Sequence, residues 1–268
     1  VRQRHPRDLR HFTRLLLTAV PELHANRRLA SAAGDLGLET EIVDATRTVA
    51  TTTPDAALWR GGEDLLAPAP DVVLARVGNW RPESLLAALE AAEAAGVPTP
   101  NQAAAIRCGR DHWLTMQRLS AAGLPVPTTV AGAEPDTLAS LAVARLGLPV
   151  VVKQRRSRMG VGVILCATRD HLEAVLDSLW RVGDEVVVQT FVRTGGRSLR
   201  AMVVGGEVVA AVRFSAGEAE WRSNAARGGA ALAADGGSGA ARGRCGVGAG
   251  ARGLRGRPAG RTRRRRGR

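Results

Sequence analysis

The amino-acid sequence predicts an α/β protein in which a first α/β layer is followed by mixed α+β lobes. Three observations predict it. Strand and helix signals alternate over the first hundred residues, glycines lead into strands in the middle, and a Gly-Gly pair joins two later strands. Hydrophobic residues make up 45% of the 268 residues and aromatic residues only 3%. We therefore expect one large or two to three small domains with cores of Ala, Val and Leu.

The first part of the chain predicts a small, mostly parallel sheet with helices. Residues 14–20 (RLLLTAV) have the apolar pattern of a buried strand. Gly37 and Gly96 mark the ends of two helices, and Pro82 stands at the start of the second. The expected elements are strand 14–20, helix 25–36, strands 39–44 and 71–76, and helix 82–95.

The middle of the chain predicts a second sheet with helices of its own. Residues 149–153 (PVVVK) have the pattern of a fully buried strand, and Asp170 with Glu173 predicts the capped start of a helix. Gly205-Gly206 suits the positive φ that a two-residue hairpin turn requires. The expected elements are helix 111–122, strands 149–153 and 159–165, helix 171–181, strand 185–191 and the hairpin strands 199–204 and 207–214.

The positive charge is concentrated at the end of the chain. Residues 236–268 hold eleven Arg and eleven Gly with no Asp or Glu, which accounts for +11 of the formal net charge of +13. The other 235 residues carry only +2, which argues against nucleic-acid binding by the folded part. Gly and Arg without periodicity predict a disordered tail.

Cysteines and apolar runs exclude further classes of protein. Cys108, Cys166 and Cys245 are odd in number and far apart, so we expect neither a disulfide framework nor a metal site built on them. Every apolar run is far shorter than the ~20 residues of a membrane span. The basic start lacks the apolar stretch of a secretory signal. We expect a cytoplasmic protein without a membrane partner.

Lys153 is the strongest candidate for a ligand contact. It is the only lysine among 38 Lys and Arg residues, and it ends a buried strand. A solitary ammonium in an arginine-rich chain favours coordination of phosphate. The polar turn that follows contains Gly160 and Gly162, whose backbone can approach a phosphate closely. The spacing matches neither a Walker loop nor a dinucleotide fingerprint and predicts a β-hairpin flap over a ligand. The alternative is a lysine that ends a strand by chance.

Polar residues further along the chain form weaker candidates. The strand that ends at residues 189–191 could offer backbone groups at its edge to a flat base, or be an ordinary core strand. Arg200 and Arg213 lie on the predicted hairpin, and each taken singly is most simply a solvated arginine. The run 222–224 (Arg-Ser-Asn) before residues 227–229 (Arg-Gly-Gly) is a denser polar cluster.

The order of these parts resembles the ATP-grasp ligases of the RimK type, from about residue 14 to about residue 229. The segments that carry the resemblance are Asn101, Ala105-Ile106, Asp111 at a helix start, AAGLPVPTT, VVVK, MGVGV, VVVQTF, LRAMVVGGEVVAAVRF and WRSNAARGG. The resemblance implies an ATP-grasp fold with an N-terminal α/β domain and two α+β lobes, the last one incomplete. The expected boundaries are 1–106 for the N-terminal domain, 107–184 for the central lobe, 185–235 for the partial C-terminal lobe and 236–268 for the tail.

The resemblance also implies roles on the nucleotide side. Lys153 would contact the ATP phosphates, and Gly160 with Gly162 would shape the flap over them. The full set expected at the nucleotide is Lys153, Gly160, Gly162, Gln189, Thr190, Phe191, Ser198, Arg222, Ser223, Asn224 and His112.

Three of these positions depart from the family pattern. Thr190 precedes Phe191 where the family usually has Glu before an aromatic residue. Ser198 stands in the place of an Asp that contacts the nucleotide. His112 follows Asp111 where a Lys is common, and a protonated histidine would replace part of that phosphate contact.

The reaction implied by the resemblance joins glutamate to a carboxyl group. Transfer of the γ-phosphoryl group of ATP turns the carboxylate into an acyl phosphate, which an amine then attacks. Arg76 matches a strand-end arginine near the acceptor side, and Arg200 or Arg222 is the expected cation beside the tetrahedral intermediate. Magnesium is implied as a second cofactor. The acceptor stays open between a protein tail, a peptide and a small metabolite.

The magnesium ligands of the family are missing from the sequence. The resemblance implies an Asp and a Glu-x-Asn pattern beyond the Arg-Ser-Asn motif, yet no Glu follows Glu220 and no Asp follows Asp235. One hypothesis is a frameshift near residues 236–240, since GC-rich DNA out of frame encodes Gly, Ala, Arg and Pro. It predicts a poorly soluble chain with weak ATP affinity and little turnover. The other hypothesis is a genuine extension that binds RNA electrostatically, although no aromatic residue is interleaved for base stacking.

Three functions other than a ligase remain open on the sequence. The first is a nucleotide-binding protein without turnover. The second is an RNA-binding protein that acts through the tail, and the third is a structural α/β domain without a ligand.

Overall fold

The computed structural model describes residues 13–52, 56–156, 162–216, 221 and 230–233. The chain divides into two compact units, Val1–Val192 and Arg193–Arg268. Within the described ranges, no helix combines the length and the apolar character that a membrane crossing requires.

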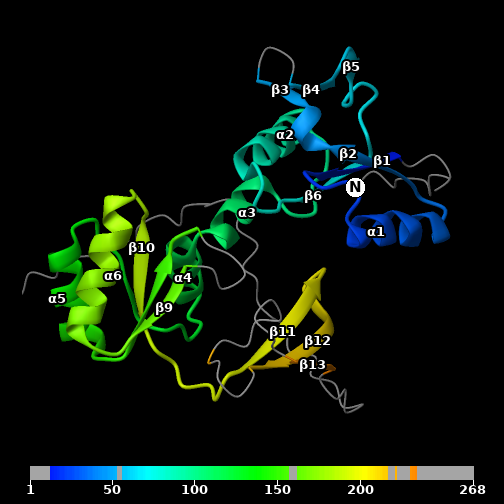
Figure 1. The fold of residues 1–268 in the computed structure, drawn as a ribbon. Helices are drawn as coiled ribbons and strands as arrows, with labels where there is room; N and C mark the ends of the chain where they lie inside the picture. The colour runs from blue at the N-terminus through cyan, green and yellow to red at the C-terminus, as the bar shows by residue number, and fades with distance from the viewer. Residues whose placement is uncertain (1–12, 53–55, 157–161, 217–220, 222–229, 234–268) are drawn as a thin grey trace, which may run out of the picture. The chain divides into compact units, whose positions relative to one another are not determined.

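A three-stranded parallel sheet forms the N-terminal layer of the first unit (Figure 1). The strand order is β2 (Glu39–Asp44), β1 (Thr13–Thr18), β6 (Val72–Arg76). Helix α1 (His24–Asp35) lies between β1 and β2 in the chain. The parallel sheet confirms the prediction, and these bounds differ from the expected ones by two residues or fewer.

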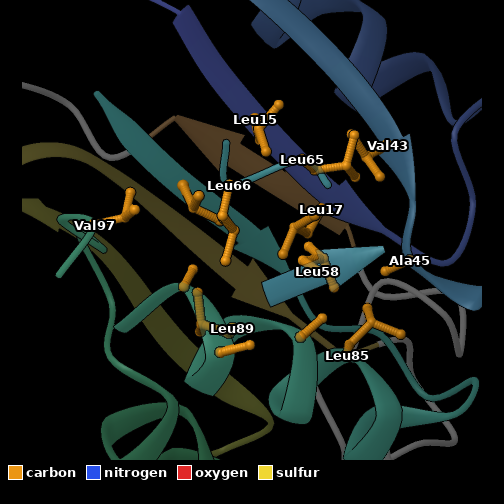
Figure 2. Packing of buried hydrophobic residues seen from close by; sticks show 14 of the residues in the cluster. Leu15, Leu17, Val43, Ala45, Leu58, Leu65, Leu66, Leu85, Leu89 and Val97 are labelled. Atoms are coloured by element: carbon orange, nitrogen blue, oxygen red, sulfur yellow. The ribbon is translucent and has the colours of Figure 1, made fainter. Parts of the chain in front are cut away.

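Aliphatic side chains from the sheet and from helix α2 (Pro82–Ala94) form the core of this layer (Figure 2). Leu15, Leu16 and Leu17 are all buried, because a central parallel strand is covered on both of its faces. Leu85 and Leu89 of α2 are fully buried in the same cluster as Leu15 and Leu17. Helix α2 thus covers one face of the sheet. The carboxyl ends of β1 and β6 lie at the edge of this layer.

Several elements, most of them short, are not predicted by the sequence. A second sheet joins β3 (Val49–Thr51), β4 (Ala57–Arg60) and β5 (Glu63–Asp64) in antiparallel order. These strands have two to four residues, too few for an alternating pattern to show. Helices α3 (Ala103–Arg110) and α5 (Pro135–Leu146) and the 3-10 turn η2 (Ala45–Arg47) are also missed.

A four-stranded antiparallel sheet forms the central lobe. Its order is β7 (Thr129–Val130), β10 (Val186–Thr190), β8 (Val150–Gln154), β9 (Val163–Cys166). Strands β8 and β9 pair as the predicted hairpin, and residues 157–161 between them lie outside the described residues.

Helices α5 and α6 (Arg169–Arg181) cover one face of the central sheet (Figure 1). Val150 and Val152 of β8 pack there against Leu172 and Leu176. Helix α4 (His112–Ala121) belongs to the same lobe and begins beside the end of β8.

The start of helix α6 corrects one expectation. The N-cap is Thr168 and not Asp170, and its hydroxyl accepts the His171 N–H at 3.3 Å. Glu173 instead accepts the Arg169 Nε–H at 2.6 Å. Thr168 is the N-cap because its backbone is extended, as this position requires, whereas Asp170 already lies within the helix.

The second unit contains a long hairpin. Strands β11 (Arg197–Val204) and β12 (Glu207–Ser215) pair in antiparallel fashion, and β13 (Ala230–Ala233) extends the sheet beside β12. Gly205 and Gly206 have φ angles of 61° and 88°, which confirms the predicted two-residue turn.

Candidate functional site

Lys153 lies on the face of the central sheet that is opposite to helices α5 and α6. Val150 and Val152 belong to the core under those helices, and side chains alternate along a strand. Lys153 therefore points to the other face. It pairs with Val187 of β10 on one side and with Val163 of β9 on the other. Two neighbouring strands thus hold the backbone of this lysine in place.

The Lys153 ammonium is partly buried and has no anionic partner among the described residues. Burial lowers the pKa of this group, because desolvation disfavours the charged form. A partly desolvated cation without a counter-ion among the described residues is suited to bind an anion such as a phosphate group.

Gly162 has a packing role immediately before strand β9. Its φ is 66°, and a Cβ added there would lie 2.0 Å from Oε1 of Gln154. The Gln154 N–H donates to the Gly162 carbonyl at 3.0 Å, and its side-chain Nε2 donates to Asp184 Oδ2 at 2.6 Å. The glycine makes room for this glutamine. Its predicted approach to a phosphate stays a prediction, and Gly160 lies outside the described residues.

Asp111 joins the start of helix α4 to the end of strand β8. The residue is only 3% exposed. Its Oδ1 accepts the N–H groups of Trp113 and Leu114 at 2.9 and 3.0 Å, which is the geometry of an N-cap. Its Oδ2 accepts the Nε–H of Arg155 at 2.7 Å. One carboxylate thus caps a helix and forms an ion pair at the same time.

His112 lies at the same junction as the first residue of α4. Its backbone N–H donates to the carbonyl of Arg155 at 2.9 Å. Arg155 follows Lys153 by two residues, so the structure brings His112 and Lys153 to the same end of β8. A contact of either side chain with phosphate remains a prediction.

Strand β10 is not the free edge that the sequence suggests for residues 189–191. It lies between β7 and β8, and Gln189 pairs with Thr129 on one side and Val151 on the other. The Gln189 side chain is 2% exposed and donates to Thr129 Oγ1 at 2.8 Å. Of the two alternatives that the sequence left open, the structure supports an interior core strand and not an open edge at Gln189, because the short β7 completes the ladder. The strand ends at Thr190, and the half-buried Phe191 follows it.

Arg76 lies at the carboxyl end of β6, opposite Thr18 at the carboxyl end of β1. The chain leaves β1 toward β2 on one side, while β6 lies on the other side. Such a reversal opens a crevice in which ligands of α/β sheets commonly bind. A pocket of about 510 Å³ lies there, and its polar lining includes Arg76, Asn79, Asn101 and Arg110.

Ser198 and Arg200 lie on β11 in the second unit. Both are exposed, and Ser198 pairs with Phe214 of β12. The Arg200 guanidinium lies over the Phe214 ring, 5.2 Å from its centroid. The roles expected for Ser198 and Arg200 stay predictions. Arg222, Ser223 and Asn224 lie outside the described residues.

The part of the chain that the structure describes does not fit a magnesium site. Within it, no group of three or more His, Cys, Asp or Glu side chains is placed to hold a metal ion. Magnesium requires several oxygen ligands, usually including carboxylates. The positive charge available near the end of β8 comes instead from Lys153 and arginine side chains.

Sequence reasoning misses three residues of these sites, Arg155, Arg110 and Asn79. Arg155 is followed by Arg156, and nothing in the pattern distinguishes the arginine that pairs with a buried carboxylate from its neighbour. Asn79 follows the end of β6 by three residues. A polar residue just beyond the carboxyl end of a strand is the signal that could have found it.

Comparison with known proteins adds the family to this geometry. A model of the RimK-like ATP-grasp domain matches residues 109–235. A probable alpha-L-glutamate ligase of Thioalkalivibrio sulfidiphilus is 35% identical over 218 residues, which cover 81% of this chain and 72% of the relative.

Solved structures share the fold. A RimK domain ATP-grasp protein from Sphaerobacter thermophilus has a TM-score of 0.60 and 25% identity, covering 75% of this chain and 72% of that one. The ATP-grasp ligase PsnB, solved with a phosphomimetic variant of its minimal precursor, Mg and ADP, has a TM-score of 0.53 at 22% identity. That match covers 77% of this chain and 74% of PsnB.

The fold and the comparisons define an ATP-grasp ligase, an enzyme class that forms carbon–nitrogen bonds, and they confirm the predicted fold. More narrowly, the chain belongs to the RimK-like ATP-grasp family, whose members use ATP and magnesium.

Proposed function

We propose that this protein is an ATP-dependent carboxylate–amine ligase that joins glutamate to a carboxylate through an acyl phosphate. ATP supplies the phosphoryl group that activates the carboxylate. The relatives named as probable alpha-L-glutamate ligases support glutamate as the amine substrate. The acceptor is a carboxylate of a protein, a peptide or a small molecule, and the protein acts in the cytoplasm.

The observation that carries the proposal is the Lys153 ammonium. It is partly desolvated, and among the described side chains it faces no carboxylate. A buried charge without a partner costs stability, so the fold retains it at a cost that ligand binding can offset. Phosphate oxygens are the ligand that a compact ammonium at a strand end serves best.

Other residues complete the nucleotide side in this proposal. His112, whose backbone lies at the same end of β8, contacts phosphate in this proposal, and Gly160 with Gly162 shapes a flap over the phosphates, as the resemblance to the family implies. Thr190 and Phe191, at the end of β10, face the base. Ser198, Arg222, Ser223 and Asn224 also contact the nucleotide, as the resemblance to the family implies.

A substrate carboxylate binds at Arg76 in this proposal. The pocket at the carboxyl ends of β1 and β6 has a guanidinium at its rim and amide groups from Asn79 and Asn101. Arginine offers a carboxylate two parallel hydrogen bonds, and the amides can bind its remaining lone pairs. Arg200 or Arg222 stabilises the anionic tetrahedral intermediate after the amine attacks.

A chemical protection experiment tests the nucleotide site directly. Because Lys153 is the only lysine, an amine-reactive reagent can modify only this side chain and the chain terminus, which peptide mass spectrometry separates. Burial lowers the pKa of Lys153, so at any given pH a larger fraction of this amine is neutral and reactive than in a fully solvated lysine. We expect a non-hydrolysable ATP analogue to slow its modification at least about tenfold and AMP to slow it less. Equal rates with and without the analogue would contradict the proposal.

The substitution Lys153→Met gives a second test, because it should lower the affinity for ATP and raise the stability of the free protein. We expect the affinity for the ATP analogue to fall at least about tenfold, because a charged hydrogen bond to phosphate is lost. We also expect the free protein to gain about 1 kcal/mol of unfolding free energy, since an unpaired, partly buried charge is removed. Arg145→Met on the exposed face of α5 is the control and changes neither quantity.

A nucleotide-binding protein without turnover is the second candidate function. The sequence favours it, because no Glu follows Glu220 and no Asp follows Asp235. Release of ADP in the presence of glutamate and candidate acceptors separates the two functions. Removal of residues 236–268 tests RNA binding through the tail, since RNA retention would be lost only if the tail carries it.

A further inference from the structure

Two adjacent residues, Arg110 and Asp111, bind two different parts of the proposed site. Arg110 ends helix α3, and its Nη1 donates to the carbonyls of Val77 and Gly78 at 3.3 and 2.8 Å. These carbonyls belong to the loop that follows Arg76. The first residue of the pair therefore holds the loop on the carboxylate side.

Asp111 holds the phosphate side through Arg155. Besides the ion pair at 2.7 Å, Arg155 donates its backbone N–H to the Glu185 carbonyl at 2.7 Å and accepts the His112 N–H at 2.9 Å. Its Nη1 lies 3.4 Å from a Glu185 carboxylate oxygen. Arg155 thus connects helix α4, strand β8 and the start of β10, two residues after Lys153.

The hydrogen bonds of Arg110 and the ion pair of Asp111 with Arg155 border one cavity in the first unit. A pocket of about 450 Å³ is lined by Asn79 from the loop after β6, by Gln154 and Arg156 from the segment after Lys153, and by Arg110 and Asp111 between them. Arg156 Nε lies 3.8 Å from Asp111 Oδ2 with 70% of its side chain exposed, so its charge still faces the cavity. The dipeptide is the covalent link between the two walls.

We infer that Arg110–Asp111 is a positioning element that aligns the two parts of the proposed site. Asp111 holds the segment that carries Lys153, on the phosphate side, and Arg110 holds the loop after Arg76, on the carboxylate side. This inference rests on the proposed function. Neither residue needs to touch a substrate. Each holds backbone that carries a contacting residue, Lys153 in one direction and Arg76 in the other. Because ligation requires the activated carboxyl group and the phosphate to meet, an error of about 1 Å in either wall costs about a hundredfold in rate.

The variant Asp111→Asn tests the phosphate side. Asparagine is as good an N-cap as aspartate, so helix α4 keeps its cap while the ion pair to Arg155 is lost. We expect the dissociation constant for a non-hydrolysable ATP analogue to rise about tenfold, as happens when groups that orient a ligating residue are removed. Arg155→Met should give a similar rise in this dissociation constant. The double variant Asp111→Asn with Arg155→Met should bind the analogue no more weakly than the single variant with the higher dissociation constant.

The variant Arg110→Met tests the carboxylate side. We expect hydrogen exchange at residues 77–79 to speed up, while affinity for the ATP analogue stays within about twofold of the wild type. In Asp111→Asn, the faster exchange should instead appear at residues 154–156. The control pair is Asp177 and Arg181 on α6, whose Nε–Oδ2 distance of 2.8 Å nearly equals that of Asp111 and Arg155 but whose side chains are exposed. Asp177→Asn should leave affinity and exchange at both segments unchanged.

The outcomes separate the inference from the proposed function. If the wild type does not bind the analogue, the proposed function fails. If the wild type binds, Lys153→Met does not, and Asp111→Asn and Arg155→Met both bind normally, only the inference is wrong. The inference is equally wrong if Arg110→Met weakens nucleotide binding as much as Asp111→Asn, because the dipeptide would then be a general structural joint. If Asp111→Asn lowers the thermal stability without changing the affinity for the ATP analogue, the dipeptide is likewise a general structural joint and the inference is wrong.

Discussion

The central sheet and the β11–β12 hairpin are both antiparallel, yet they bury very different fractions of their apolar side chains. Val150, Val152 and Val188 of the central sheet are fully buried. In the hairpin, Leu199 is 63% exposed and Val204 is 61% exposed, and every residue of β11 is exposed. Within the described residues, the hairpin strands pair along their length but bury little apolar surface, so backbone hydrogen bonds and the Arg200–Phe214 contact hold their geometry.

This difference bears on the ligase site. The lobe that carries Lys153 has its own hydrophobic core, formed with α5 and α6. The hairpin that carries Ser198 and Arg200 has none of comparable size among its described residues. We expect the surroundings of Lys153 to be formed in the free protein, whereas the geometry of the hairpin depends on whatever covers it.

The largest expected effect distinguishes the buried central sheet from the exposed hairpin. Leu172→Ala removes a fully buried side chain and should lower the unfolding free energy by about 3 kcal/mol. Leu199→Ala, on the hairpin, should change it by less than about 0.5 kcal/mol. Urea unfolding measures both. Similar losses for the two variants would break the comparison, since they would show that the hairpin is covered in solution.

A pair of glycine substitutions compares the central lobe and the hairpin at single positions. Gly162→Ala and Gly206→Ala both place a side chain at positive φ, at 66° and 88°, which costs about 1 kcal/mol. Only at Gly162 does the new Cβ also meet Gln154, so we expect a total loss of about 2 kcal/mol there. An Ala at Gly206 has no atom within 4 Å to displace. If the two losses prove equal in urea unfolding, Gln154 can move aside at no cost.

Cys166 reports on the core of the central lobe through pH. The residue is fully buried, and burial raises the pKa of its thiol from 9.0 to about 11. The folded chain therefore keeps a proton that the unfolded chain loses, and stability should fall as pH rises from 9 toward 11. The expected loss at pH 10 is about 1 kcal/mol. Cys166→Ala should remove this slope in pH-dependent unfolding, and an unchanged slope would assign it to another group.

The smallest expected effect lies on the hairpin. Arg200→Gln removes the cation over the Phe214 ring, which at an exposed site should cost about 0.5 kcal/mol. If Arg200 acts at the tetrahedral intermediate, the same variant should lower the turnover rate far more than this stability loss explains. Thermal unfolding and ADP release on one sample measure the two effects. Arg213→Gln on β12 is the control for a hairpin arginine without a proposed role.

Local patterns were enough to predict most elements and the candidate lysine. The strand at residues 39–44, the Gly-Gly turn and the lysine after a valine run depend on residues close in sequence, where periodicity and turn chemistry act. The sheet β3–β5 and helix α3 escaped because they are short. The cap of α6 was misplaced because Thr168 and Asp170 are both good N-caps, and only the backbone decides between them.

Contiguous motifs of the sequence are sufficient to predict the fold class, the family and Lys153 as the candidate lysine. Three other features depend on how distant segments pack: β10 is an interior strand, Arg155 pairs with a carboxylate 44 residues away, and Arg110 reaches the loop after Arg76. These facts depend on the order in which strands lie side by side. That order is set by the packing of distant segments, which no local pattern encodes.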